Sequence, residues 1–467
     1  MASLKKNLVY NFIYQILILL LPLATAPYLS RVVMEEGVGV YSFSYSVALY
    51  FTYFTLLGMN NYGSRSIAAV QNDLQKRSAL FCQLYGLQMM SFAVSIILYV
   101  VYVIFFSVDR IAALIMLTGT ASALFDINWF FFGIEKFRLT VTRNALIKLL
   151  TVICIFVFVR SREDIYIYIL IMGTSMLLSQ LCLWPFLRKY IRFVRPSFRD
   201  IIKHLRSDLV LFIPVIAISV YKIMDKIMLG YICNMSEVGY YENAEKIINI
   251  SLTLIISVGT VMMPRMTALI SAGDKKSAGK YLDTSVTIVS CYCIGMMCGL
   301  FVLAPEFSVV FYGEAFRKSG TVMILLAVTI IFLGVGNVIR TQYLIPMKKD
   351  RIYISSALIG AAVNLVVNIV LIPIMSSEGA AVGTIAAEVS VFLYQVISVR
   401  RRLRLSLYIR NALVYSFFGI IMMAAVILIP PLSSPAADLI VRMTAGAAVY
   451  SALSGVYLIK KKRAGRN

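Results

Sequence analysis

Charged side chains stand inside stretches that are otherwise apolar, and these are the residues that could do chemistry. Lys222, Asp225 and Lys226 are spaced i, i+3 and i+4, which places them on one face of a helix. A charge inside a bilayer costs about 2.5–3.5 kcal/mol on insertion scales, so each one needs a reason. Two interpretations stay open: a cationic lining for an anionic substrate, or side chains that reach the membrane interface and pair with one another.

Further charges border or begin neighbouring apolar runs. Glu242, Glu245 and Lys246 begin the run that follows. Arg31 ends the first run, and Arg65 and Arg265 end two others, where each either faces a cavity or anchors a helix at the headgroups. The candidate substrate-binding cations are Lys222, Lys226, Lys246, Arg31, Arg65 and Arg265.

Carboxylates inside the apolar runs form a second candidate group. Asp126 and Glu388 have no evident partner in the sequence. A buried carboxyl group can carry a proton through a membrane, or it can hydrogen-bond to a neighbouring helix. The candidate ion-coupling or cavity carboxylates are Asp225, Glu388, Asp126 and Glu245.

Patterns of catalysis and metal binding are missing from the sequence. There is no Asp-x-Asp, no Ser/His/Asp set and no phosphate-binding glycine loop, and the 7 Cys form no C-x-x-C pair. We therefore expect no enzyme activity, no catalytic residue, no metal and no cofactor. The single histidine, His204, falls in a basic loop and is expected to be solvated.

The elements that position these residues follow from composition. Sixty per cent of the residues are hydrophobic and only 14% are charged, which is typical of a chain surrounded by lipid. Although the first run resembles a secretory signal peptide, it is long enough to span. The sequence predicts an all-α polytopic membrane protein with about fourteen transmembrane helices, at roughly 10–29, 38–60, 81–106, 111–133, 144–160, 165–187, 209–231, 240–263, 285–304, 320–340, 353–374, 379–399, 411–431 and 439–459.

Orientation follows from the basic residues. The net charge is +22, and most of the 44 Lys and Arg residues fall in alternate connections between the apolar runs. Because cytoplasmic loops carry an excess of Lys and Arg, this pattern places both termini in the cytoplasm. A strongly basic soluble chain would suggest nucleic acid, but short clusters between spans indicate topology instead.

Two halves of the chain share motifs about 200 residues apart. Val38-Gly39 corresponds to Val238-Gly239, and Asp73 before Lys76-Arg77-Ser78-Ala79 corresponds to Asp274 before Lys275-Lys276-Ser277-Ala278. Six spans in each half give a parallel repeat of two six-helix lobes, an arrangement typical of transporters. The predicted parts are an N-lobe at 1–187, a cytoplasmic linker at 188–208, a C-lobe at 209–399, and two added helices with a basic tail at 400–467.

Several stretches resemble Wzx-type polysaccharide flippases, the polysaccharide transporter family of the MOP (MATE-like) superfamily. The resemblance covers nearly the whole chain. Its motifs are Pro27-Tyr-Leu-Ser-Arg31 with Gly37-Val-Gly-Val-Tyr41, Tyr62-Gly-Ser-Arg65-Ser-Ile-Ala68, Phe125-Asp-Ile-Asn-Trp129 through Phe137, Asp225-Lys-Ile-Met-Leu-Gly230, Ala244-Glu-Lys246, and Asn364-x3-Asn368 through Pro373 with Gly379-Ala-Ala and Glu388.

The resemblance implies movement of undecaprenyl-diphosphate-linked oligosaccharide repeat units from the cytoplasmic to the outer leaflet of the bacterial cell membrane. Alternating access coupled to protons or sodium ions is expected, with polysaccharide polymerase and chain-length machinery as candidate partners. The first span has no cation before Arg31, whereas some lipid-flipping relatives place an arginine deeper. The alternatives are a MATE-type small-molecule exporter, a flippase of the peptidoglycan lipid precursor, and a membrane-embedded polymerase, which would normally carry a large outer loop.

Overall fold

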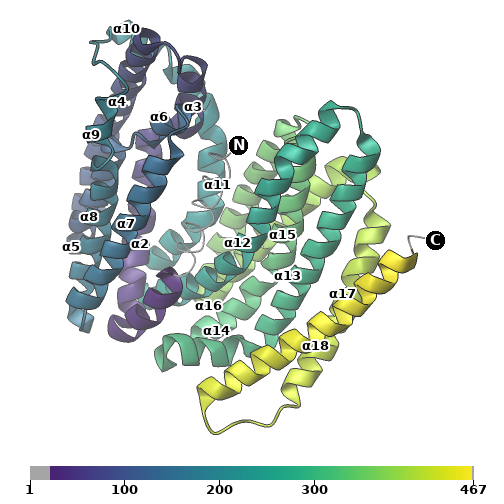
Figure 1. The fold of residues 1–467 in the computed structure, drawn as a ribbon. Helices are drawn as coiled ribbons and strands as arrows, with labels where there is room; N and C mark the ends of the chain where they lie inside the picture. The colour runs from purple at the N-terminus through teal and green to yellow at the C-terminus, as the bar shows by residue number, and fades with distance from the viewer. Residues whose placement is uncertain (1–20, 465–467) are drawn as a thin grey trace. The chain divides into compact units, whose positions relative to one another are not determined.

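Helices and short connections account for the whole described structure. The computed structural model describes residues 21–464, and no strand occurs among them. The all-α prediction is therefore confirmed for this part of the chain. Contacts between residues divide the chain into two compact units that meet in sequence between Gly239 and Tyr240 (Figure 1).

In the first unit, a helical stretch at residues 21–32 leads into α2, which packs against α4, α5 and α11. A cluster of buried side chains joins Phe81 of α4 to Trp129, Phe130 and Phe131. The helices are α2 (Met34–Leu56), α3 (Met59–Ala69), α4 (Leu74–Phe105), α5 (Arg110–Ala121), α6 (Asn128–Gly133), α7 (Phe137–Phe158), α8 (Ile165–Leu181), α9 (Trp184–Leu187), α10 (Phe198–Ile202) and α11 (Leu205–Ile232), with short 3₁₀ turns at Ser122–Phe125 and Arg162–Asp164.

The second unit is built around α13, which packs against α14, α15, α17 and α18. Helices α13, α17 and α18 run side by side (Figure 1). The helices are α12 (Met235–Ser271), α13 (Lys275–Tyr312), α14 (Arg317–Ala327), α15 (Thr329–Ile339), α16 (Asp350–Val399), α17 (Leu405–Ile427) and α18 (Pro435–Ala464), with 3₁₀ turns at Glu314–Phe316 and Arg400–Arg402 and a π-helical turn at Arg340–Leu344.

Ten helices in the described residues are long and apolar enough to cross a membrane, or eleven if the bent pair Glu314–Ala327 and Thr329–Leu344 is one span. Helix α16 counts once, but it has 50 residues and bends at Ser376, where φ is 51° and ψ is −126°. The sequence predicts two spans there. Helix α2 is not among the ten, and the predicted span at 10–29 lies partly outside the described residues. Fourteen spans therefore stays a prediction.

Two aspartates that the repeat relates occupy the same structural position. The carboxylate of Asp73 accepts hydrogen bonds from the backbone N–H groups of Gln75 and Lys76, both at 3.0 Å, and so caps α4. The carboxylate of Asp274 accepts one from the N–H of Ser277 at 3.0 Å and caps α13. Because a cap satisfies N–H groups that the first helical turn leaves unpaired, both motifs start a long helix in the same way. These hydrogen bonds lower the pKa of both carboxyl groups.

The repeat-related glycines Gly39 and Gly239 lie against each other. An ideal Cβ at Gly39 would be 1.7 Å from the backbone oxygen of Met235, and one at Gly239 would be 2.1 Å from the oxygen of Glu35. Only a residue without a side chain allows two helix backbones to approach this closely. The first turn of α12 therefore crosses the start of α2 at this glycine pair.

Helix α11 belongs to the first compact unit by its contacts with α2 and α3. The sequence assigns it to the C-lobe, which begins at residue 209. The segment before it, predicted as a linker at 188–208, lies along α4: Arg77 donates to the backbone oxygen of Tyr190 at 2.7 Å, and the N–H of Arg192 donates to the Ser78 hydroxyl at 3.0 Å. The lobe boundaries stay a prediction.

Candidate functional site

The predicted charged face of α11 combines buried and accessible groups. Asp225 is only 1% exposed, Lys226 is half-buried and Lys222 is exposed. Pro214 lies in the same helix two turns earlier, where it removes one backbone hydrogen bond and favours bending. The structure thus places two cations and one buried carboxylate on a helix whose preceding turns can bend.

Lys246 on α12 is paired within its own helix. Its Nζ lies 3.3 Å from a carboxylate oxygen of Glu242 and 3.3 Å from the side-chain oxygen of Asn243. Glu245, one residue earlier, is half-buried. A phosphate approaching this lysine would compete with an internal carboxylate, so Glu242 can tune its affinity for anions.

The three predicted arginines at helix ends are exposed. Arg31 donates to the backbone oxygen of Pro27 at 3.1 Å. The guanidinium of Arg265 lies over the ring of Tyr281, 4.5 Å from its centroid, and donates to the Tyr281 hydroxyl. Arg65 stands on α3. Contacts of this kind fit anchoring at a helix end as well as substrate binding, and both interpretations of these arginines remain.

Asp126 has partners that the sequence did not reveal. The chain breaks from helix here, with φ −74° and ψ 104°, between a 3₁₀ turn and α6. The Asp126 carboxylate accepts hydrogen bonds from the backbone and side-chain nitrogens of Asn128, at 2.9 and 2.7 Å. Asn128 also donates to Gln180 on α8 at 3.0 Å. A discontinuous helix with buried polar side chains is a recurrent feature of transporter sites.

Arg143 on α7 joins the same network. Only 8% of it is exposed, and its guanidinium donates to the side-chain oxygens of Asn128 at 3.1 Å, Asn144 at 2.7 Å and Gln180 at 3.3 Å, and to the backbone oxygen of Ser179. Asn128 thus bridges a buried cation and the Asp126 carboxylate. In the sequence, Arg143 is one of the basic residues that predict a cytoplasmic connection. Only the polar residues on neighbouring spans could have indicated that it is buried in a network.

The carbonyl groups freed by this break are also satisfied. Gln88 on α4 donates to the backbone oxygens of Ala123 at 2.7 Å and Asp126 at 2.9 Å, and its own oxygen accepts from the Trp129 indole at 3.0 Å. The indole of Trp184 donates to the oxygen of Phe125 at 3.0 Å. Because these backbone groups find side-chain partners, irregular structure is tolerated inside the unit.

Glu388 lies in the second half of α16, after the bend, and is 6% exposed. On the first half, Asn364 and Asn368 are fully buried and hydrogen-bond to each other at 3.2 Å. Gly383 packs directly on Asn368, because an ideal Cβ there would be 2.0 Å from the asparagine oxygen. The two halves of α16 therefore fold together and bury a polar patch, separate from the Asp126 network.

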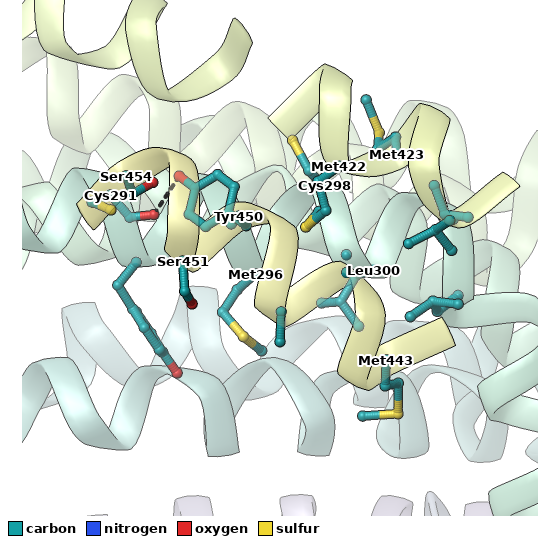
Figure 2. A pocket seen from close by; sticks show the side chains of 18 of the residues that line it. Cys291, Met296, Cys298, Leu300, Met422, Met423, Met443, Tyr450, Ser451 and Ser454 are labelled. Atoms are coloured by element: carbon teal, nitrogen blue, oxygen red, sulfur yellow. Dashed lines mark hydrogen bonds between the residues drawn. The ribbon is translucent and has the colours of Figure 1, made fainter. Parts of the chain in front are cut away.

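An apolar cavity of about 580 Å³ lies among α13, α17 and α18 (Figure 2). Gly295, Gly299 and Gly446 leave room for it, and methionines such as Met296 and Met443 line it. On one side the Tyr450 hydroxyl donates to the backbone oxygen of Cys291 at 2.7 Å. The cavity has the chemistry of a site for hydrocarbon.

The prediction that His204 is solvated is wrong. The side chain is 8% exposed, with one ring nitrogen 2.7 Å from the Tyr62 hydroxyl and the other 3.0 Å from the Gln83 oxygen. Residues on α3 and α4 contact it. Because these residues are far from His204 in the sequence, its basic neighbours could not reveal that it is buried. In the described part of the chain, no group of three His, Cys, Asp or Glu residues could hold a metal ion.

Comparisons with known proteins agree with these features. A family model described as polysaccharide biosynthesis protein matches residues 4–270, more than half of the chain. The chain is 26% identical over 284 residues to a "Putative O-antigen transporter" of Shigella dysenteriae, covering 60% of this chain and 70% of that one. It is 22% identical over 406 residues to a protein of the same name in Escherichia coli K12, covering 85% and 97%.

Solved structures share the fold. The inward closed conformation of the lipid II flippase MurJ matches with a TM-score of 0.76 and 16% identity, covering 97% of this chain and 98% of that chain. An inward-facing MATE family transporter of the MOP superfamily matches with a TM-score of 0.56 and 14% identity, covering 83% and 98%.

The fold is shared with solved membrane transporters and flippases, among them a MATE family transporter of the MOP superfamily. The chain belongs to the polysaccharide biosynthesis protein family. The predicted resemblance is confirmed, and the relatives are transporters and flippases rather than enzymes.

Proposed function

We propose that this protein is a flippase that moves undecaprenyl-diphosphate-linked oligosaccharide repeat units from the cytoplasmic to the outer leaflet of the bacterial cell membrane. The observation that carries the proposal is the likeness to the O-antigen transporter relative over 97% of that protein's length. An oligosaccharide with a diphosphate is too polar to cross hydrocarbon unaided, so its transfer needs a protein path.

In this proposal the diphosphate meets Lys222 and Lys226 of α11 and Lys246 of α12. Lysine ammonium groups form strong, charge-assisted hydrogen bonds with phosphate oxygens. The Lys246–Glu242 pair, at 3.3 Å, keeps that lysine neutralised until an anion competes. Spans 1–6 rock against spans 7–12 to expose the site on alternate sides, and protons or sodium ions acting at Glu388 or Asp126 drive the cycle.

The apolar cavity supports a lipid-bearing substrate. It lies among α13, α17 and α18, and its lining of methionines, glycines and aliphatic side chains suits a hydrocarbon chain. Flexible methionines adapt to a chain without fixed shape. Both termini lie in the cytoplasm in this scheme, and the polymerase and chain-length machinery would receive the product on the outer side.

The test of the function is the sidedness of the lipid-linked repeat unit in sealed vesicles from a deletion strain. Complete units trapped on the cytoplasmic face are expected, and restoring the gene should return them to the outer face. Normal outward units with no polymer would instead indicate a polymerase. No change in either would contradict the flippase.

The cationic site has its own test. Replacing Lys222, Lys226 and Lys246 together by Gln should abolish surface polysaccharide, because the diphosphate loses its counter-charges. The matched control replaces Lys275, Lys276 and Lys280, which are exposed in the first two turns of α13, by Gln. Equal polysaccharide in both variants would show that the three proposed lysines do not bind the substrate.

The phenotype of a deletion strain distinguishes the rival functions from the proposed one. A MATE-type exporter, whose fold this chain shares, predicts raised drug sensitivity after deletion, with lipid-linked units distributed normally. A flippase of the peptidoglycan lipid precursor predicts that the gene is essential for growth. Viable cells with normal drug resistance and trapped repeat units would leave only the proposed function.

A further inference from the structure

A carboxyl group with no hydrogen bond is buried in the first turn of α11. Asp208 is 0% exposed, and neither of its carboxyl oxygens has a hydrogen-bond partner. The Asp126 carboxylate, by contrast, accepts two hydrogen bonds from Asn128. An ionised carboxylate without water or donors is strongly disfavoured, so the neutral, protonated acid is the form that this environment accommodates.

The surroundings of Asp208 mark a break in another helix. Between α2 and α3, Leu57 has φ 47° and ψ −126°, a strained conformation for a residue with a side chain. Gly58 follows, and an ideal Cβ there would be 2.4 Å from the backbone oxygen of Asp208 and 2.9 Å from the Cβ of Leu211. The N–H of Gly58 approaches the carboxyl group without reaching hydrogen-bond geometry. Asp208 is therefore buried beside a close backbone contact between α11 and the α2–α3 break.

The same turn is fastened to the first unit by His204, one helical turn earlier. The ring of His204 contacts Tyr62 of α3 and Gln83 of α4 through its two nitrogens. The N–H of Asp208 donates to the backbone oxygen of His204 at 3.0 Å. His204 therefore holds the start of α11 in place. If Asp208 separates from the α2–α3 break, α11 would turn about His204 as a hinge.

Charged and titratable groups on the neighbouring elements do not neutralise Asp208. They are Tyr53 of α2, Tyr62 and Arg65 of α3, Asp200 and Lys203 at α10, and His204 and Arg206 at the start of α11. Arg65 and Arg206 are exposed. Lys203 pairs with Asp200 at 3.0 Å. In the described structure, then, the proton itself is the group that can compensate the Asp208 charge.

We propose that Asp208 is a proton-binding site, occupied in the present arrangement, that couples protonation to the packing of α11 on the α2–α3 break. When the first turn of α11 separates from Gly58, water enters, the O–H bond of the acid breaks and the proton passes to water. Because the turn follows the basic segment assigned to the cytoplasmic side, the proton exchanges with the cytoplasm. As a driver of substrate movement, this site rests on the proposed flippase function.

Infrared spectroscopy of the purified full-length protein in lipid nanodiscs tests the site directly. A protonated carboxylic acid has a C=O stretching band that its carboxylate lacks. We expect a band that persists at pH values where exposed carboxyl groups are ionised and that disappears in Asp208→Asn. Asp126→Asn is the matched control and should retain the band. An identical band in wild type and Asp208→Asn would overturn the proposal.

A second variant covers the case in which Asp208→Asn does not fold. Gly58→Ala places a methyl group against the Asp208 backbone and should loosen the contact, so water reaches the carboxyl group. The band should then titrate at lower pH than in wild type. An unchanged titration in a folded Gly58→Ala protein would show that this contact does not hold the proton.

Coupling is measured with sealed vesicles that carry lipid-linked oligosaccharide and an imposed pH gradient. The gradient should speed transfer by wild type clearly more than transfer by folded Asp208→Asn. Full stimulation of the variant would overturn the coupling role. If wild type moves no such lipid under any gradient, the proposed function fails, and the infrared titration still decides whether Asp208 binds a proton.

Discussion

Arg143 shows what a single buried residue contributes here. Its guanidinium meets four uncharged acceptors on three different elements and lies one asparagine away from the Asp126 carboxylate. Only the planar fork of an arginine offers enough donors in fixed directions for this set. The network therefore ties the broken span to α7 and α8 within the first compact unit.

Removing this cation should destabilise the protein strongly. Arg143→Gln removes the cation that faces Asp126 across Asn128 and leaves buried acceptors without a donor, and each unsatisfied buried group costs about 1–3 kcal/mol. The unfolding temperature of the purified protein measures the loss, with the exposed Arg188→Gln as control.

The double variant Arg143→Gln with Asp126→Asn should recover part of that stability, because no unpaired charge remains. Strictly additive losses would contradict a coupled pair. Restored stability without restored transport would show that the pair also serves function.

At the scale of the helices, packing depends on close approach between helix backbones and on breaks within helices. Gly39 and Gly239 permit two backbones to touch, α16 folds at Ser376, and the α5–α6 span opens at Asp126. The α5–α6 break is stabilised by Gln88 and Trp184, which donate hydrogen bonds to its backbone oxygens. The sequence marked the glycine pair through the repeat, but it predicted neither the α5–α6 break nor its partners, because Gln88 and Gln180 come from other spans.

A methyl group at Gly39 should disturb the first unit. In Gly39→Ala the new Cβ would meet the Met235 backbone oxygen, which cannot rotate away, so the helices must separate. Overpacking of this kind costs about 1–3 kcal/mol. Thermal unfolding measures it.

Gly279→Ala is the matched control, because nothing lies within 4 Å of its ideal Cβ. There the substitution should raise helix stability by up to about 1 kcal/mol. Equal effects at the two positions would contradict the close crossing.

At the scale of the whole molecule, the membrane sets the arrangement. Helices in the described residues supply ten or eleven candidate spans, while the basic residues predict which connections face the cytoplasm. The chain belongs to the polysaccharide biosynthesis protein family and shares its fold with solved flippases and transporters. The side of the membrane that each connection faces is therefore a prediction from sequence that can be tested directly.

Single-cysteine labelling tests that topology. In a variant lacking the 7 native cysteines, Glu163→Cys and Lys189→Cys place thiols at exposed positions in successive connections, after α7 and after α9. A membrane-impermeant thiol reagent added to intact cells should label only Glu163→Cys. Labelling of Lys189→Cys alone would invert the predicted orientation, and labelling of both would contradict a span between them.

The sequence by itself predicted the membrane class, the all-α fold, most of the apolar runs that form long helices, and the family. These follow from local composition and from motif order. Only the tertiary structure decided which polar residues meet: Arg143 with Asn128 and Gln180, His204 with Tyr62 and Gln83, and Asp208 with the break at Gly58. Such contacts depend on how separate helices pack. The hydrophobic pattern along one helix does not specify which other helices it will contact.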